Sequence, residues 1–252
     1  MFAFDAMHLA HVRANAHSRG MSMWSAISNF GDAALTLPLA ATCCLWLAIG
    51  GSGWRAAWTW LGLLAAAALL VGATKILYAG CGVEWRAIDF RVISGHTMLA
   101  AGVWPMACML GTDGSGRPLA SRLALACGFV LATAITTARA FDRAHSVSEV
   151  IVGLAVGALV TVCFLRWRGV PSVVPGRRPY ALASLLLVSV AMYGQHAPIQ
   201  RAIQKYSPYL CRGAASTSAS LVLCPIFTGA LLHPWRWPPW PLAGARHARA
   251  IQ

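Results

Sequence analysis

The sequence predicts an all-α protein, a polytopic membrane bundle of six transmembrane helices, and both composition and segment length support this prediction. Hydrophobic residues make up 58% of the 252 residues, and charged residues make up only 11%. A soluble domain carries roughly 25% charged residues, so this chain lacks the residues for a mostly soluble surface. A disordered chain is excluded as well, because segments this apolar collapse or insert into a membrane.

Apolar segments that approach the length of a membrane span recur along the chain. A transmembrane helix needs about 20 apolar residues, and the candidates are 28–50, 57–79, 95–111, 121–138, 147–167 and 179–195. The third candidate is short, and helix tilt or local membrane thinning would accommodate it. A seventh apolar run, Ala214–Leu232, contains Ser/Thr clusters and Pro225. It could be a re-entrant segment, a surface segment or a seventh span.

We expect three regions: an N-terminal interfacial segment (1–27), a six-helix transmembrane domain (28–197) and a membrane-associated tail (198–252). The N-terminus has no uninterrupted apolar stretch followed by a small-residue cleavage site, so a cleavable signal peptide is not expected. Its histidines lack an accompanying carboxylate or cysteine framework, which favours an amphipathic helix over a metal site. The tail interleaves Pro, Trp and Arg, a composition that suits a membrane surface.

The charge distribution predicts how the helices are oriented. The chain has 20 Lys and Arg against 7 Asp and Glu, a balance that would suggest nucleic-acid binding in a soluble protein. Here the basic residues fall mainly between apolar runs, so we expect the lipid bilayer as partner and no nucleic acid. Short Arg-rich loops mark the cytoplasmic side, which assigns 51–56, 112–120 and 168–178 to the cytoplasm. The loops 80–94 and 139–146 then face outward, and we expect a multi-pass inner-membrane protein with its polar site on the periplasmic side.

Three groups of polar residues interrupt the apolar sequence, and all three map to this outward face. Ionisable residues at membrane depth are energetically costly and are functional candidates by default. The groups are Lys75 with Arg86 and Arg91 in the loop after it, then Ser94-Gly95-His96, and finally Arg139, His145 and Glu149.

The spacing of these residues points to phosphate-ester chemistry. His145 and Glu149 are i,i+4 neighbours, so the carboxylate can orient the imidazole as a nucleophilic histidine requires. Ser94-Gly95-His96 opens a predicted helix, where free backbone N–H groups attract an anion and glycine permits close approach. Lys75 and Arg139 add positive charge that stabilises a transferring phosphoryl group. The alternative for Lys75 is a lysine that merely extends to the membrane surface.

Arg139-x5-His145-x3-Glu149 together with Ser94-Gly95-His96 resembles the type 2 phosphatidic acid phosphatase superfamily. The three signatures of that superfamily read KxxxxxxRP, PSGH and SRxxxxxHxxxD. The resemblance covers about Lys75 to Gly157, including the glycine-rich continuation HSVSEVIVGLAVG. The joint match of two signatures at a suitable separation is specific, whereas neither alone would be.

The resemblance implies a role for each matched residue. His145 would be the nucleophile that forms a phosphohistidine, Glu149 would orient it, and His96 would be the general acid that protonates the leaving group. Lys75, Ser94, Gly95 and Arg139 would hold the phosphate. The resemblance implies no metal and no other cofactor.

The chain departs from the signatures at four places. Ile93 replaces the proline of PSGH, Ala138 replaces the serine before the arginine, and Glu149 replaces the aspartate. In the first signature, the seventh residue after Lys75 is Gly82 rather than arginine. Either Arg86 or Arg91 could supply that second cation from a longer loop, and the sequence does not choose between them.

The resemblance implies an integral membrane lipid phosphatase acting on a lipid phosphomonoester or diphosphate. Undecaprenyl diphosphate, phosphatidic acid, phosphatidylglycerol phosphate and lipid A phosphates are all chemically admissible. Two alternatives stay open: a phosphotransferase on the same scaffold, and a non-catalytic protein that binds or transports a lipid phosphate.

Overall fold

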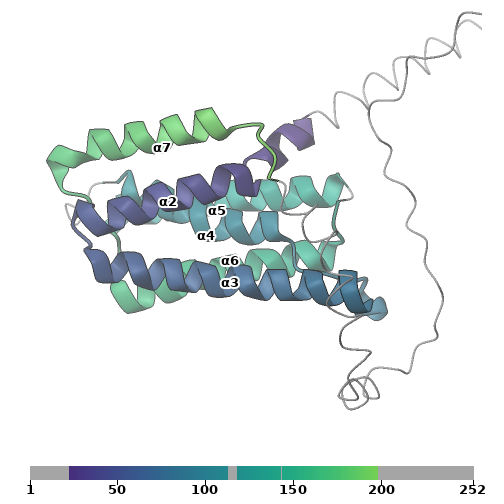
Figure 1. Ribbon diagram of the computed structural model, residues 1–252. Coiled ribbons are helices and arrows are strands. Elements are labelled where there is room, and N and C mark those ends of the chain that lie inside the picture. The colour runs from purple at the N-terminus through teal and green to yellow at the C-terminus, as the bar shows by residue number, and fades with distance from the viewer. Residues whose placement is uncertain (1–22, 113–117, 143, 198–252) are drawn as a thin grey trace, which may run out of the picture. The chain divides into compact units, whose positions relative to one another are not determined.

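The computed structural model describes residues 23–112, 118–142 and 144–197, and these ranges are helical and contain no β-strand. Figure 1 shows the long helices, which are α2 (Ala33–Gly50), α3 (Trp54–Cys81), α4 (Gly95–Leu110), α5 (Pro118–Phe141), α6 (Val147–Arg168) and α7 (Arg178–Met192). The short 3₁₀ helices η1 (Arg86–Ile88) and η2 (Pro175–Arg177) lie in connecting loops, and residues 23–29 are also helical. The all-α prediction is confirmed for the described residues, and each of the six predicted segments overlaps one long helix. The tail 198–252, the run Ala214–Leu232 and most of the segment 1–27 lie outside the described residues.

Four helical segments in the described ranges are long and apolar enough to cross a membrane. They are Met23–Gly50, Trp54–Cys81, Leu119–Phe141 and Val147–Arg168. The helices α4 and α7 have 16 and 15 residues, or about 24 and 22 Å at 1.5 Å per residue. That length falls short of the hydrocarbon core, which is about 30 Å thick. The count of six spans therefore stays a prediction, with four helical segments meeting the length requirement.

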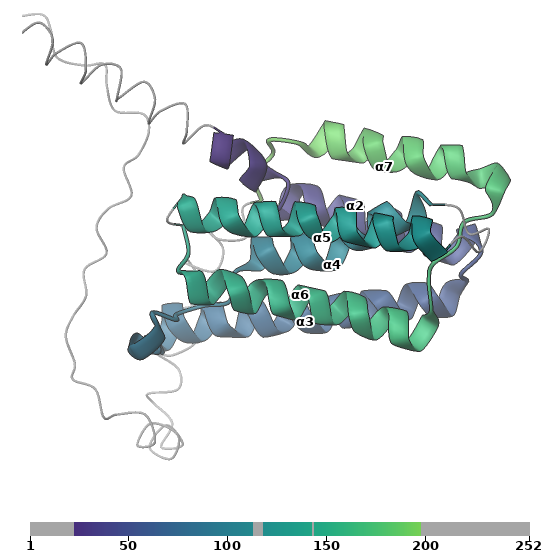
Figure 2. The same cartoon turned by 180° about the vertical axis from the view of Figure 1, so that it is seen from behind.

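The short helix α4 lies at the centre of the bundle. It packs against α2, α3, α5, α6 and α7, and most of its residues are buried, including Met98, Ala101 and Met106. Figure 2 shows α4 behind α5 and α6, with which it makes its most extensive contacts. The outer helices instead expose large apolar side chains such as Leu69 and Val130, as expected for surfaces that face lipid.

Two glycines bring α6 against the first turns of α4. A Cβ atom at Gly153 would collide with Thr97 Oγ1 and would lie 2.6 Å from the Ser94 carbonyl oxygen. A Cβ atom at Gly157 would collide with the Met98 carbonyl oxygen. Small residues four apart allow such backbone approach between membrane helices. The glycine-rich stretch of the sequence thus fixes the distance between the N-termini of α4 and α6.

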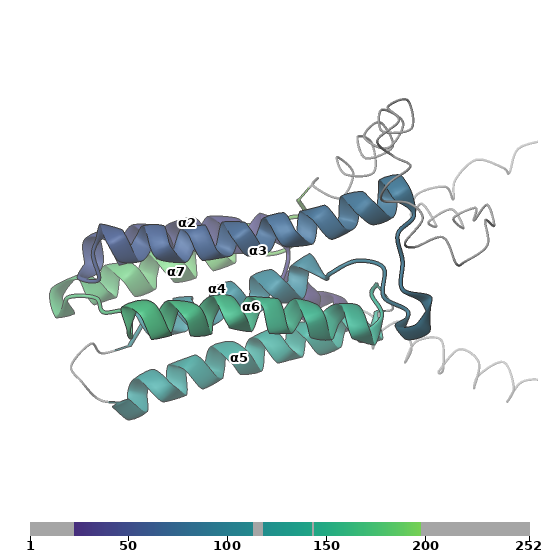
Figure 3. The ribbon, with the colours of Figure 1, turned by 90° about the horizontal axis from the view of Figure 1, so that it is seen from below.

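The alternating direction of the helices gathers the polar residues at one end of the bundle. The helices α2, α4 and α6 begin where α3, α5 and α7 end (Figure 3). The opposite end is closed by a bridge between Gly51 and Val173 and by Arg177, whose Nη1 donates to the Ile49 carbonyl oxygen. The three polar groups identified in the sequence therefore share one end.

Candidate active site

The start of α6 holds His145 beside a carboxylate. Ser146 is the N-cap residue of α6 and forms a capping box with Glu149 at the third helical position. The His145 Nδ1 atom lies 2.7 Å from Glu149 Oε2, and both side chains are nearly buried. Because an ionised carboxylate only accepts hydrogen bonds, Nδ1 carries the proton in this pair and Nε2 keeps its lone pair.

Glu149 also holds the loop that precedes α4. Its Oε1 atom accepts hydrogen bonds from the backbone N–H groups of Arg91 at 3.0 Å and Val92 at 3.3 Å. Its own carbonyl oxygen accepts from the Ser94 N–H at 3.2 Å. The capping-box position turns the side chain back along the helix, and the glutamate spans from His145 to this loop. This geometry accommodates the extra methylene relative to the aspartate of the family signature.

The start of α4 presents groups suited to an anion. Ser94 is the N-cap of α4, and its fully buried Oγ atom has no hydrogen-bond partner among the described residues. A Cβ atom built at Gly95 would lie 3.7 Å from Lys75 Nζ, so this ammonium group lies next to the helix N-terminus. The first N–H groups of a helix have no intrahelical partner and bind anions readily.

Arg139 in the last turn of α5 adds a second cation. Its Nη1 atom donates to Ser28 Oγ at 3.3 Å, while its buried Nε atom has no partner within the described part of the chain. A buried guanidinium donor without a partner is costly, and an anion bound here would satisfy it. Arg139 and Lys75 both interact electrostatically with His96 and His145, so the structure brings these four residues into one cluster.

The surroundings of His145 favour its neutral form. Burial lowers the pKa of His145 below its ordinary value of 6.5, the hydrogen bond to Glu149 opposes this shift, and the positive charges of Arg139 and Lys75 lower the pKa further. A neutral imidazole with a free Nε2 atom is the form that can attack phosphorus.

The two loop arginines are bound differently from Lys75 and Arg139. Arg86 pairs with Glu84, and Arg91 Nη2 lies 2.9 Å from Asp89 Oδ1. Both guanidinium groups are well exposed. Arg91 contributes its backbone N–H to Glu149, whereas its side chain pairs with a carboxylate of its own loop. The structure therefore does not bring either side chain into the cluster as the missing cation of the first signature.

Asp32 is a residue at this end that sequence reasoning missed. It is the N-cap of α2, and its Oδ2 atom lies 3.5 Å from His96 Nε2. The signal was present in the sequence, because Asp32 and Glu149 are the two acidic residues inside the six predicted apolar segments. Because the first span was predicted from its overall apolar composition, Asp32 was counted as part of that span and not as a site residue. Ser28, the partner of Arg139, carried no comparable signal.

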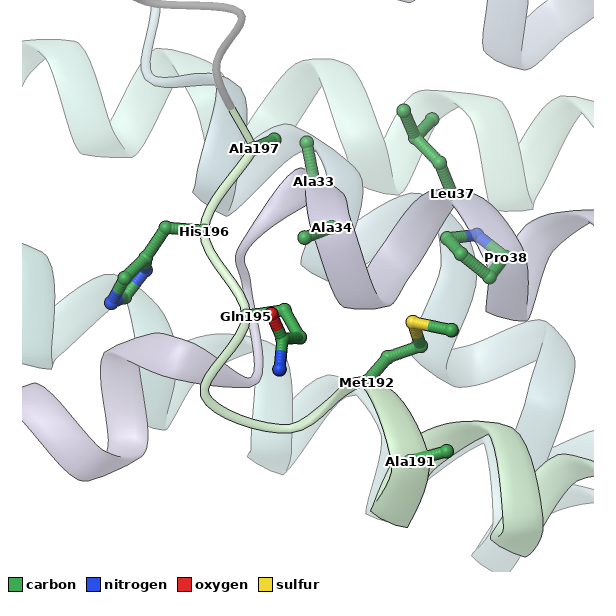
Figure 4. Close-up of a pocket in the computed structure, with 9 residues that line it drawn as sticks. All are labelled: Ala33, Ala34, Leu37, Pro38, Ala191, Met192, Gln195, His196 and Ala197. Atoms are coloured by element: carbon green, nitrogen blue, oxygen red, sulfur yellow. The ribbon is translucent and has the colours of Figure 1, made fainter.

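A groove of about 700 Å³ lies between α2 and the end of α7. Figure 4 shows its lining, which is apolar apart from Gln195 and His196 and consists of Ala33, Ala34, Leu37, Pro38, Ala191, Met192, Gln195, His196 and Ala197. Ala34 and Ala197 donate backbone hydrogen bonds to Asp32, and His196 contacts it as well. Asp32 thus contacts both residues that line this groove and His96.

The cluster combines the parts of a phosphoryl-transfer site. It holds an oriented imidazole, a second histidine and two cations. Within the described residues it also has buried polar atoms without a hydrogen-bond partner at Ser94 Oγ and Arg139 Nε. Such donors and cations stabilise the charge that spreads over a transferring phosphoryl group.

Comparison with known proteins agrees with this chemistry. A family model described as the PAP2 superfamily matches residues 78–171, a range that includes Ser94, His96, Arg139, His145 and Glu149 but begins three residues after Lys75. A Klebsiella pneumoniae protein described as "Uncharacterized 22.5 kDa protein in cps region" is 35% identical over 142 residues, which are 56% of this chain and 68% of that protein. No solved structure matches the chain. The chain belongs to the PAP2 superfamily and is a membrane protein of the phosphatase type.

Proposed function

We propose that this protein is a metal-independent lipid phosphatase of the inner membrane, with its active site at the periplasmic surface. The observation that carries the proposal is the His145–Glu149 pair at 2.7 Å, set beside Lys75 and Arg139. A protein that only binds a phosphate needs the cations but has no use for a histidine whose second nitrogen is kept free by a buried carboxylate.

The reaction proceeds in two steps. His145 Nε2 attacks phosphorus, a P–N bond forms, and the bond from phosphorus to the leaving oxygen breaks while His96 gives that oxygen a proton. Water then attacks phosphorus, His96 takes a proton from the water, and the P–N bond breaks to release phosphate and restore His145. Lys75, Arg139, Ser94 and the N–H groups at the start of α4 hold the phosphoryl oxygens throughout.

The position of the site supports a lipid substrate. The cluster lies at one end of a bundle whose outer surface is apolar, so a phosphate at the membrane surface reaches it while the hydrocarbon tail stays in the bilayer. The substrate class is a lipid phosphomonoester or diphosphate, with undecaprenyl diphosphate and phosphatidic acid as the first candidates. The opposite end carries Arg55, Arg166, Arg168, Arg177 and Arg178, which favours a cytoplasmic location for that end.

Phosphate release from a panel of lipid phosphates tests the proposal. The full chain in detergent, with EDTA present, is expected to release inorganic phosphate from at least one lipid, and His145→Ala is expected to abolish the release. Arg168→Ala, which alters an exposed arginine at the opposite end, serves as the control and retains activity. If turnover of the lipid phosphate requires an added lipid or sugar alcohol, the protein is a phosphotransferase and not a hydrolase. No turnover under either condition, with lipid binding retained, would favour the non-catalytic alternative.

A further inference from the structure

The two histidines of the cluster each have a carboxylate partner, and the two partners come from different helices. Glu149 in α6 binds His145, whereas Asp32 at the start of α2 lies 3.5 Å from His96 Nε2. The family signatures contain the partner of His145 alone, since Asp32 lies 64 residues before His96 and outside the matched range 78–171.

The carboxylate of Asp32 is held in place from three sides. Its Oδ1 atom accepts the N–H of Ala34 at 2.8 Å and the N–H of Ala197 at 3.1 Å. Its Oδ2 atom lies 3.3 Å from His196 Nδ1. The side chain is only 11% exposed, so these contacts and His96 account for most of its surroundings. A carboxylate fixed in this way imposes an orientation on a neighbouring imidazole.

Close packing also limits where His96 can lie. A Cβ atom at Gly31, the residue before Asp32, would lie 3.2 Å from the His96 carbonyl oxygen and 3.3 Å from the His96 Cβ atom. The turn that precedes α2 is therefore in contact with the first turn of α4, and Asp32 faces His96 across this contact. The first transmembrane segment thereby takes part in the site that the later helices build.

We propose that Asp32 is a positioning residue that sets His96 up as the general acid, an inference that rests on the proposed phosphatase function. Asp32 accepts a hydrogen bond from the N–H group at His96 Nε2, which leaves Nδ1 as the nitrogen that serves the substrate. The negative charge stabilises the ring when both nitrogens are protonated. In the first step the Nδ1 proton moves to the leaving oxygen as the bond from phosphorus to that oxygen breaks. The Nε2 proton stays between His96 and Asp32, which remains ionised.

The choice of leaving group separates this role from a structural one. An alkoxide leaving group needs a proton, whereas a 4-nitrophenolate leaves readily without one. A residue that acts through the general acid therefore affects the rate of the first step most strongly for alkyl phosphates. General acid catalysis contributes on the order of 10² to 10⁴ in rate, and a share of this factor depends on correct positioning of the acid.

The first variant to measure is Asp32→Asn. Asparagine caps helices about as well as aspartate, so this change keeps an acceptor for the Ala34 N–H and removes the charge facing His96. We expect kcat/KM for dodecyl phosphate, which reports the first step, to fall by on the order of 100-fold, with less than about threefold change in kcat/KM for 4-nitrophenyl phosphate. Because His96 takes the proton from water in the second step for both substrates, kcat can fall for both. Asp89→Asn alters an exposed acid at the same end of the bundle and is expected to leave both rates unchanged.

Two further variants keep the test decisive. Asp32→Glu retains the charge and is expected to restore a large part of the alkyl phosphatase activity. Combining Asp32→Asn with His96→Ala should lower the alkyl rate no further than His96→Ala alone, because the two residues act as one unit. Equal losses of kcat/KM on both substrates, or loss of the folded protein in both Asp32 variants, would overturn the role proposed for Asp32. Failure of the unmodified chain to hydrolyse either substrate would instead contradict the phosphatase itself.

Discussion

His145 and Glu149 show how far single residues could be predicted from the sequence. The i,i+4 spacing predicted that the carboxylate reaches the imidazole, and in the structure the two groups lie 2.7 Å apart. The further contacts of Glu149 with the N–H groups of Arg91 and Val92 could not be predicted, because they join residues 57 and 58 positions apart. The contact between Asp32 and His96 could not be predicted for the same reason, because the two residues lie 64 positions apart in the chain.

The protonation of His145 is the property at this scale that can be measured most directly. Burial and the nearby cations lower the pKa of His145 below 6.5, so the ring is expected to be mostly neutral at pH 6.5 and to gain its second proton only as the pH falls further. Nuclear magnetic resonance of ¹⁵N-histidine-labelled protein checks this, with the His145 signals assigned by their loss in His145→Ala. A midpoint above 6.5 would show that Glu149 outweighs the combined effect of burial, Arg139 and Lys75.

At the scale of elements, the contact between α4 and α6 decides the geometry of the site. The apolar run lengths predicted both helices, and the observed bounds of α4, Gly95–Leu110, end one residue before the predicted bound. The lengths of the apolar runs could not predict that α4 is enclosed by its neighbouring helices. Because it is enclosed, a helix too short to cross the membrane core by itself can occupy the centre of the bundle. The glycine pattern is local, whereas its partner surface on α4 lies more than 50 residues earlier in the chain.

Substitution of Gly153 tests the importance of this contact. Gly153→Ala would place a methyl group against Thr97 Oγ1 and the Ser94 carbonyl oxygen, and overpacking of this kind costs about 1–3 kcal/mol. We expect a lower melting temperature in detergent and a fall in kcat of at least about tenfold, because Ser94 and His96 move relative to His145.

Gly72→Ala in α3 is the matched control for this substitution. A Cβ atom at Gly72 would have no neighbour within 4 Å, and alanine is favoured over glycine in a helix by up to about 1 kcal/mol. We expect its melting temperature and activity to equal or exceed those of the unmodified chain. Equal behaviour of the two variants would mean that close approach of α6 to α4 is not what positions the site.

At the scale of the whole molecule, composition predicted a helical membrane protein, and the alternating helices bring the polar groups to one end. The number of spans is less well defined by the sequence, since α4 and α7 are shorter than the core of a bilayer. The first signature illustrates the same difficulty for loops. Arg86 and Arg91 are close to Lys75 in the chain, yet each pairs with an acid of its own loop, a choice that depends on loop conformation rather than on spacing.

Labelling of introduced cysteines on intact cells tests the orientation. Arg86 and Arg177 are both exposed and lie at opposite ends of the bundle. A membrane-impermeant thiol reagent is expected to label Arg86→Cys and to leave Arg177→Cys unlabelled until the membrane is opened, with the unmodified chain as the reference for its native cysteines. Labelling of Arg177→Cys alone would place the site on the cytoplasmic side.

The most direct test of the proposed mechanism is to trap the phosphoryl group on His145. The protein would be mixed with a ³²P-labelled lipid phosphate that it hydrolyses, quenched in alkali within milliseconds and analysed by peptide mass spectrometry. We expect an acid-labile, alkali-stable phosphate on His145 that is absent from His145→Ala and that accumulates when release is slowed. Turnover without this intermediate, or the label on another residue, would contradict the assignment of His145 as the nucleophile.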